Sequence, residues 1–131
     1  MLPSWKLVAS RPLEEGIAHA RGERTLRTVP IPEEPPEIDA ATLLSLRTLS
    51  AMSQSVFARL LNVSPKTVQS WEQGVRQPSH ASRRLIQIYS EHPAAVCQSV
   101  GLPPITLPGV VIERAPSGRR KIVISAHHSS Q

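Results

Sequence analysis

The chain has 131 residues, of which 40% are hydrophobic, with thirteen prolines and one cysteine. This length allows one ordinary domain, or a small domain with arms, and a single cysteine excludes a disulfide framework or a multi-cysteine zinc site. No apolar run approaches the roughly 18 residues that a membrane helix needs, and the first ten residues hold a proline and a lysine where a signal peptide needs an unbroken apolar core. We therefore expect a cytoplasmic protein with no membrane partner.

The net charge of +5 is unevenly spread along the chain. Residues 1–38 carry a net charge of −1, whereas residues 39–100 and 101–131 each carry +3. A basic centre and tail beside a near-neutral start suggests an anionic partner for part of the chain, most commonly nucleic acid. A basic surface that serves only solubility is the alternative.

The N-terminal third divides into three predicted segments. Residues 12–21 have the spacing of a short helix with Leu13 and Ile17 on one side. Residues 25–29 alternate like a strand but have no partner within the same segment. The proline-rich run 30–36 predicts an extended spacer.

Five short helices are predicted between this spacer and the prolines at 103–108. Their N-terminal signals are Asp39, Ser53, Ser64 followed by Pro65, Ser79 and Pro93. The first helix ends near Ser50, the third has Gly74 as its C-terminal signal, and the fifth ends near Gly101.

The spacing of apolar residues predicts the inner face of each helix. The expected inward residues are Leu43, Leu46 and Leu49 in the first helix, Val56, Phe57, Leu60 and Leu61 in the second, and Ala81, Leu85 and Ile88 in the fourth. Arg83, Arg84 and Gln87 are expected to point outward.

The C-terminal segment predicts a β-hairpin, in which GVVIER and RKIVIS flank a turn at residues 115–118. A lone hairpin is marginal in water, so it must pack or pair. The basic run 119–121 fits either a contact with the DNA backbone or a hairpin that supports a dimer. Residues 126–131 look disordered.

Residues 54–73 have the pattern of a helix-turn-helix. Ala58 supplies the small residue that a close helix crossing needs, and Asn62 is one of the few non-glycine residues that tolerate a positive φ in the turn. Val63 and Val68 close the pair from inside, with Trp71 in the core. We expect Glu72 to bond to the backbone or to a basic neighbour, since phosphate would repel a free carboxylate.

In such a motif, the N-terminal part of the second helix contacts bases in the major groove. The candidate base contacts are Pro65, Lys66, Thr67, Gln69 and Ser70. The candidate phosphate contacts are Gln54, Ser64, Arg59, Arg76 and Gln77.

These residues resemble the XRE, or Cro/CI, class of helix-turn-helix proteins, with Asn62 in place of the usual turn glycine. The run MSQSVFARLLNVSPKTVQSWEQGVRQPS is similar to HigA-type antitoxins, and LEEGIAHARGERTLRTV resembles the segment that precedes their helix-turn-helix. The expected fold is all-α: a five-helix lambda-repressor-like domain with an N-terminal arm and a C-terminal β-hairpin or tail. We expect boundaries of 1–36 for the arm and linker, 37–101 for the DNA-binding domain and 102–131 for the tail.

The resemblance implies a homodimer that binds double-stranded operator DNA, represses its own operon and neutralises a small RelE-fold mRNA-cleaving toxin. An arm without an internal partner suits folding upon binding. The candidate toxin-binding residues are Leu13, Ile17, Thr25, Leu26, Arg27 and Val29. A solitary regulator without a toxin is the alternative.

An enzyme is not expected, and neither is a cofactor or a metal site. Cys97, His80 and His92 are the only candidates for a nucleophile and a base, and no third group orients them. Cys97 is interpreted as a small apolar filler, and the histidines are scattered along the chain.

Overall fold

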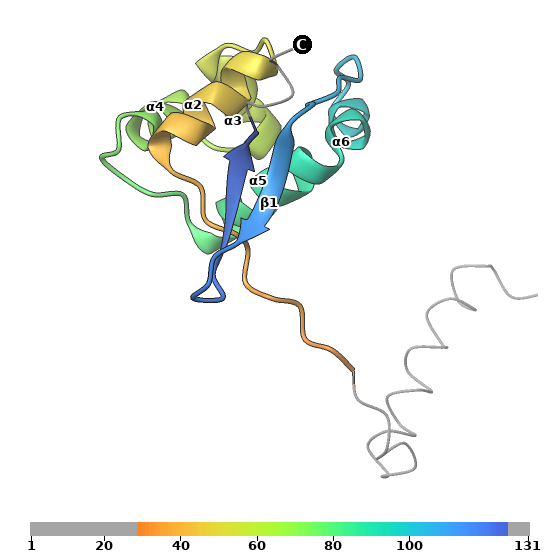
Figure 1. Ribbon diagram of the computed structural model, residues 1–131. Coiled ribbons are helices and arrows are strands. Elements are labelled where there is room, and N and C mark those ends of the chain that lie inside the picture. Colours follow the sequence, from red (N-terminus) through yellow and green to blue (C-terminus); the bar gives the residue numbers. More distant parts are fainter. Residues whose placement is uncertain (1–28, 126–131) are drawn as a thin grey trace, which may run out of the picture. The chain divides into compact units, whose positions relative to one another are not determined.

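The computed structural model describes residues 29–125, in which five helices precede a two-stranded antiparallel hairpin (Figure 1). The elements are α2 (Ala40–Leu49), α3 (Gln54–Leu61), α4 (Pro65–Glu72), α5 (His80–Glu91), α6 (Pro93–Ser99), β1 (Val110–Arg114) and β2 (Arg120–Ile124). The predicted helical domain and hairpin are thereby confirmed. The helix expected at 12–21, residues 25–28 of the expected strand and the tail 126–131 lie outside the described residues. Within 29–125, no helix has the length and apolarity needed to cross a membrane.

Side-chain caps begin four of the helices. The oxygens of Asp39, Ser53, Ser64 and Ser79 each accept a hydrogen bond from the backbone N–H three residues later. Each such cap satisfies a donor that the helix leaves open and contributes about 1 kcal/mol. The helix starts predicted from the sequence are therefore confirmed, together with their cause.

Residues with a positive φ, the left-handed backbone conformation, end or separate three of the helices. Asn62 ends α3 with φ 59°, and Gly74 follows α4 with φ 75°, both as predicted. Ala51, in the turn between α2 and α3, also has a positive φ of 56°. This conformation is costly for alanine, because its Cβ approaches the following carbonyl oxygen.

The core lies where α2, α3, α4 and α5 meet. Its fully enclosed side chains include Leu43, Leu46, Phe57, Val68, Ile86 and Tyr89. The Phe57 and Tyr89 rings meet edge to face with centroids 6.1 Å apart, and the Tyr89 hydroxyl donates to Ser50 Oγ at 2.6 Å.

Cys97 is buried in the same core, where burial raises the pKa of its thiol. Its interpretation as an apolar filler is thus confirmed.

The predicted inner faces need correction in three helices. In α5, Ile86 and Tyr89 are buried, whereas Leu85 is 45% and Ile88 41% exposed. Leu49 and Val56 are exposed as well. The bulky Tyr89 ring and its hydrogen bond to Ser50 select a different face of α5 from the one that simple apolar spacing favours.

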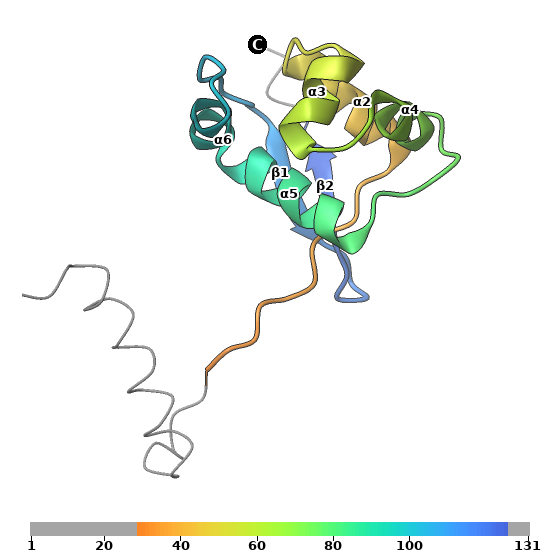
Figure 2. The same ribbon diagram turned by 180° about the vertical axis from the view of Figure 1, so that it is seen from behind.

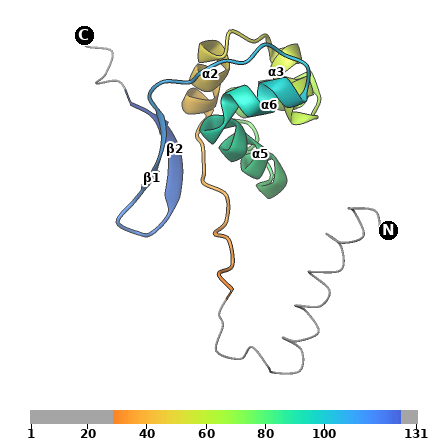
Figure 3. The same ribbon diagram turned by 90° about the vertical axis from the view of Figure 1, so that its right-hand side faces the viewer.

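The hairpin packs on the helices, β1 against α5 and β2 against α2. Figure 2 shows α5 in front of the hairpin, and Figure 3 shows the hairpin alongside the helices. Ile122 of β2 is fully buried. The hairpin and the five helices therefore belong to one unit that begins at Glu34, which meets the need of a lone hairpin for packing.

The end of the linker joins this small sheet. Glu37 forms a parallel bridge with Lys121: its N–H donates to Arg120 O at 3.0 Å and its C=O accepts from Ile122 N at 2.8 Å. Pro36 and Ile38 are buried on either side of it. Residues 30–36 contain no helix, as predicted, but the end of this run is not a separate spacer, because Pro36 is buried and the compact unit begins at Glu34.

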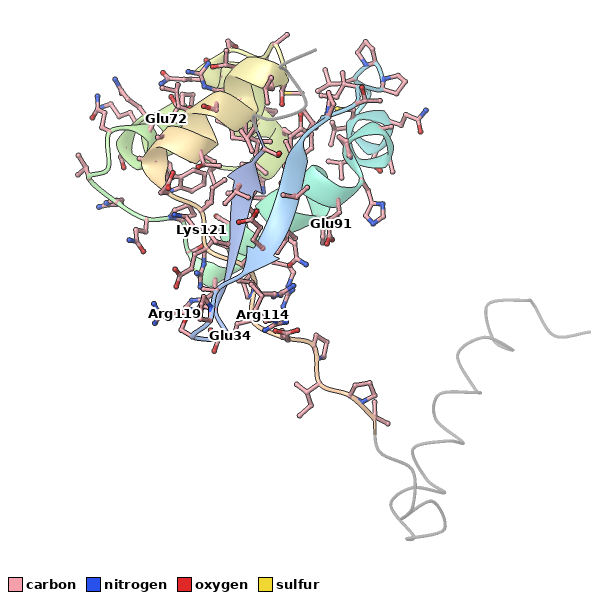
Figure 4. All side chains as sticks on the ribbon, in the orientation of Figure 1. Glu34, Glu72, Glu91, Arg114, Arg119 and Lys121 are labelled. Atoms are coloured by element: carbon pink, nitrogen blue, oxygen red, sulfur yellow. The ribbon has the colours of Figure 1, made fainter. Side chains whose placement is uncertain are left out.

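The basic run 119–121 pairs with the linker. Arg119 lies 3.3 Å from Glu37 and Lys121 lies 3.0 Å from Asp39, while Arg120 Nη2 donates to the carbonyl oxygen of Glu34 at 2.7 Å. Figure 4 shows Arg119 and Glu34 together near the hairpin turn. These contacts hold the hairpin to the start of α2. Neither of the two roles considered for this run, a contact with the DNA backbone or support of a dimer, accounts for them.

Candidate DNA-binding surface

The crossing of α3 and α4 depends on Ala58 and the left-handed Asn62. Ala58 has no exposed surface, so a larger side chain would separate the helices. Asn62 N–H donates to Arg59 O at 3.2 Å and Val63 N–H to Ala58 O at 2.9 Å, which closes the end of α3. Ser64 and Pro65 then start α4 at once. This geometry presents α4 as the recognition helix of a helix-turn-helix.

The outward side of α4 carries long polar side chains. Lys66 and Gln69 of α4 and Gln73, the residue that caps its C-terminus, are all exposed and follow the i, i+3, i+7 spacing of one helix face. Gln73 was not among the predicted site residues, although its distance from Lys66 in the sequence could have identified it. Pro65 is also exposed at the N-terminal end of the helix.

Two of the predicted base contacts are less accessible than Lys66 and Gln69. Thr67 is half-buried, and its hydroxyl lies 2.8 Å from Ser64 Oγ. Ser70 Oγ is buried and has no hydrogen-bond partner among residues 29–125. A base contact from Ser70 thus requires its hydroxyl to turn outward, whereas Lys66 and Gln69 are already exposed.

Glu72, the last residue of α4, is held in a network of hydrogen bonds with Arg47 and Gln54. Its carboxylate accepts from Arg47 Nε at 2.6 Å, from Arg47 Nη2 at 3.0 Å and from Gln54 Nε2 at 2.9 Å. Burial alone raises the pKa of the Glu72 carboxyl, but the hydrogen bonds from Arg47 and Gln54 outweigh it and hold that pKa below its ordinary value. The expectation that Glu72 bonds to a basic neighbour is confirmed.

The predicted phosphate contacts occupy three different environments. Arg76 and Gln77 are exposed in the loop after α4, and the backbone N–H groups at the start of α3 have no partner within the helix. Ser64 acts as the cap of α4, and the Gln54 amide nitrogen is engaged by Glu72. Arg59 lies on another side of α3, next to Val56, Leu60, Val100 and Leu102. The structure therefore groups Arg76 and Gln77 with α4 and separates Arg59 from Gln54.

The charge around α4 is positive because its carboxylate is neutralised. Glu72 is the only acidic residue between positions 40 and 90, its side chain is only 6% exposed and Arg47 pairs with it. Lys66 and Arg76 are exposed close to it in the chain. Exposed cations of this kind attract an anionic polymer.

Residues 29–125 contain no group of three or more His, Cys, Asp or Glu side chains arranged to hold a metal ion.

Comparison with known proteins agrees with this geometry. A family model described as helix-turn-helix matches residues 43–80, which span α2 to the start of α5. Antitoxin HigA-2 of Vibrio cholerae serotype O1 (strain ATCC 39315 / El Tor Inaba N16961) is 34% identical over 85 residues, which cover 64% of this chain and 82% of the relative. The chain belongs to the HigA family of antitoxins and carries an XRE-type helix-turn-helix domain.

Proposed function

We propose that this protein is a homodimeric antitoxin that binds operator DNA through α3 and α4, represses its own operon and neutralises a small RelE-fold mRNA-cleaving toxin through residues 1–36. Such a protein acts in the cytoplasm of a bacterium, at the nucleoid. The observation that carries the DNA-binding part is the exposed Lys66–Gln69–Gln73 row at a helix whose own carboxylate, Glu72, is paired internally.

The exposed row suits base recognition in the major groove. Lys66 can donate to guanine O6 and N7, and a glutamine such as Gln69 can bond to adenine through its amide. Thr67 and Ser70 lie beside Lys66 on α4 and can contact a thymine methyl or a phosphate, for which the Ser70 hydroxyl must turn outward. Arg76, Gln77 and the N-terminal N–H groups of α3 suit the phosphates on either side.

The DNA contacts can be tested with a fragment that covers the promoter of the gene itself. Lys66→Ala and Gln69→Ala should each weaken specific binding by roughly 1–3 kcal/mol, and binding should fall steeply with salt. Arg114→Ala is the matched control, because it removes one cation near the hairpin turn, away from α4 (Figure 4). Equal losses for Lys66→Ala and Arg114→Ala would contradict base recognition by α4.

The toxin-binding part rests on family membership and on the composition of the arm. The proposed contacts are Leu13, Ile17, Thr25, Leu26, Arg27 and Val29, of which only Val29 lies in the described residues, where it is 71% exposed. Because Pro36 is buried and Glu37 pairs with β2, a truncation that spares the DNA-binding unit should stop at residue 33 rather than 36.

Co-purification from the native locus tests the arm directly. The full chain should retain a small basic protein, and both the chain without residues 1–33 and the full-length Leu13→Asp/Ile17→Asp variant should lose it. Promoter binding should stay within about twofold of the full chain, since α4 is unaffected. If the full chain binds its promoter but retains no partner, the protein is instead a solitary XRE-family regulator.

A further inference from the structure

The outward face of α5 carries an apolar stripe. Ala81, Leu85 and Ile88 follow the i, i+4, i+7 spacing of one helix face and are all exposed. The adjoining face of the same helix fills the core with Ile86 and Tyr89. Single exposed apolar residues are ordinary, but a stripe along one helix is typical of a contact with another helix.

Opposite charges lie along one flank of this stripe. Arg84 and Glu91 are seven residues, or two helical turns, apart and therefore lie on the same side of α5. Glu91 is exposed, and Arg84 Nη1 donates to Gln87 Oε1 at 2.7 Å. When two identical helices pack antiparallel about a two-fold axis, the same flank of each helix lies on the same side of the pair and runs in the opposite direction. Arg84 would therefore approach Glu91 of the partner subunit, and Glu91 would approach the partner subunit's Arg84.

A second exposed apolar surface lacks this complementarity. A groove of about 380 Å³ is lined by Ser55, Val56, Arg59, Leu60, Val100 and Leu102. Arg59 is its only charged lining residue, so two copies joined here would bring two arginines together without an acid between them. The charges therefore favour α5 over this groove as a self-association surface.

We propose that α5 is the surface on which two copies of this chain associate, packed antiparallel so that Leu85 meets Ile88 of the partner subunit and Arg84 pairs with Glu91 of the partner subunit. The inference rests on the proposed homodimer and specifies where it forms. None of these residues belongs to α4, so the pairing leaves Lys66, Gln69 and Gln73 exposed for DNA.

Sedimentation of the full-length protein over a range of concentrations tests the apolar contact. The unsubstituted chain should be dimeric, and Leu85→Asp should raise the dimer dissociation constant about 100-fold, because the two-fold axis places the substitution in the interface twice. Leu44→Asp on α2 is the matched control: Leu44 is 42% exposed, so it tests an equally accessible leucine outside the stripe. Circular dichroism confirms that both variants fold.

A charge exchange tests the orientation of the helices. Arg84→Glu and Glu91→Arg should each weaken the dimer by roughly tenfold, and the double variant should return it to within about threefold of the original. Within one helix these residues are too far apart to pair, so recovery can only come from contact between copies. A monomeric unsubstituted chain, equal effects of Leu85→Asp and Leu44→Asp, or no recovery in the double variant would overturn the inference.

Promoter binding measured on the same samples separates this inference from the proposed function. If Leu85→Asp disrupts the dimer but the unsubstituted protein does not bind its promoter, the α5 interface is supported and the DNA-binding role is refuted. If the protein binds its promoter and Leu85→Asp leaves the dimer unchanged, the DNA-binding role is supported and the α5 interface is refuted.

Discussion

Replacing Glu72 with glutamine should destabilise the domain far more than an ordinary surface substitution. The change removes the charge that balances Arg47, whose side chain is only 17% exposed. The guanidinium then keeps its bond to Met52 O at 3.0 Å but loses both hydrogen bonds to a carboxylate. Breaking one side of a buried ion pair costs about 3–5 kcal/mol, because the remaining charge stays away from water without a counter-charge.

This cost is large against the total stability of a domain of this size. At about 0.05–0.15 kcal/mol per residue, the 92 residues from 34 to 125 should unfold with roughly 5–14 kcal/mol. The Glu72→Gln variant should therefore lose between about a fifth and all of its stability. Because α2 and α4 are joined by this pair, the orientation of the recognition helix should loosen as well.

The double variant Arg47→Met/Glu72→Leu separates the buried charge from the lost contact. It removes both charges and fills the space with apolar atoms, so it should be more stable than Glu72→Gln alone. Urea unfolding followed by Trp71 fluorescence measures all three proteins, in a Trp5→Phe background so that Trp71 is the single tryptophan. The double variant and Glu72→Gln should differ by at least about 1 kcal/mol.

The pH dependence gives a second check on the same pair. The pKa of Glu72 is lowered in the folded protein, so its contribution is complete above the ordinary value of 4.5 and is lost as the pH falls through the lower folded value. The difference between the original chain and Glu72→Gln should shrink over that acidic range. A cost below about 1 kcal/mol at pH 7 for Glu72→Gln, or a double variant less stable than the single one, would show that Glu72 does not balance a buried charge on Arg47.

Three other single substitutions have predictable effects on stability. Ala51→Gly should raise the free energy of unfolding by roughly 0.5–1 kcal/mol, since relief of the positive φ of 56° exceeds the entropy that glycine adds to the unfolded chain; equal or lower stability in urea would contradict this. Hydrogen bonds from the backbone N–H and the hydroxyl of Thr42 and from Lys121 lower the pKa of Asp39 to about 2. The stability that Asp39 contributes as a cap is therefore complete above pH 3.8 and is lost as the pH falls toward 2. Because Asp39 is 49% exposed, Asp39→Ala should cost only about 1 kcal/mol at pH 7, and urea titrations at pH 7 and pH 2 should show the difference from the original chain disappearing at the lower pH. Tyr89→Phe should cost about 1 kcal/mol in thermal or urea unfolding, because it removes the bond to Ser50 while Ser50 still donates to Leu46 O; a loss above about 3 kcal/mol would mean that the ring itself had moved.

The local signals in the sequence determined the helical part of this protein. Asp39, Ser53, Ser64 and Ser79 start helices because each side chain reaches a backbone donor three residues away, which needs no tertiary contact. The same holds for Asn62 and Gly74, whose tolerance of a positive φ is a property of the residue. The helix-turn-helix consists of such local signals at fixed spacing, and it is therefore predictable from the residues alone.

Tertiary structure decided which side of each helix is buried and which polar groups are already engaged. Leu85 and Ile88 fit an apolar face by spacing, but Tyr89 reaches Ser50, 39 residues away, and the adjoining face of α5 with Ile86 and Tyr89 is the one that is buried. Gln54 is bound by Glu72, and the basic run 119–121 by the acidic linker, through contacts between residues 18 to 86 positions apart. Periodicity describes only neighbours along one helix, so it carries no information about partners that the fold brings together from distant parts of the chain.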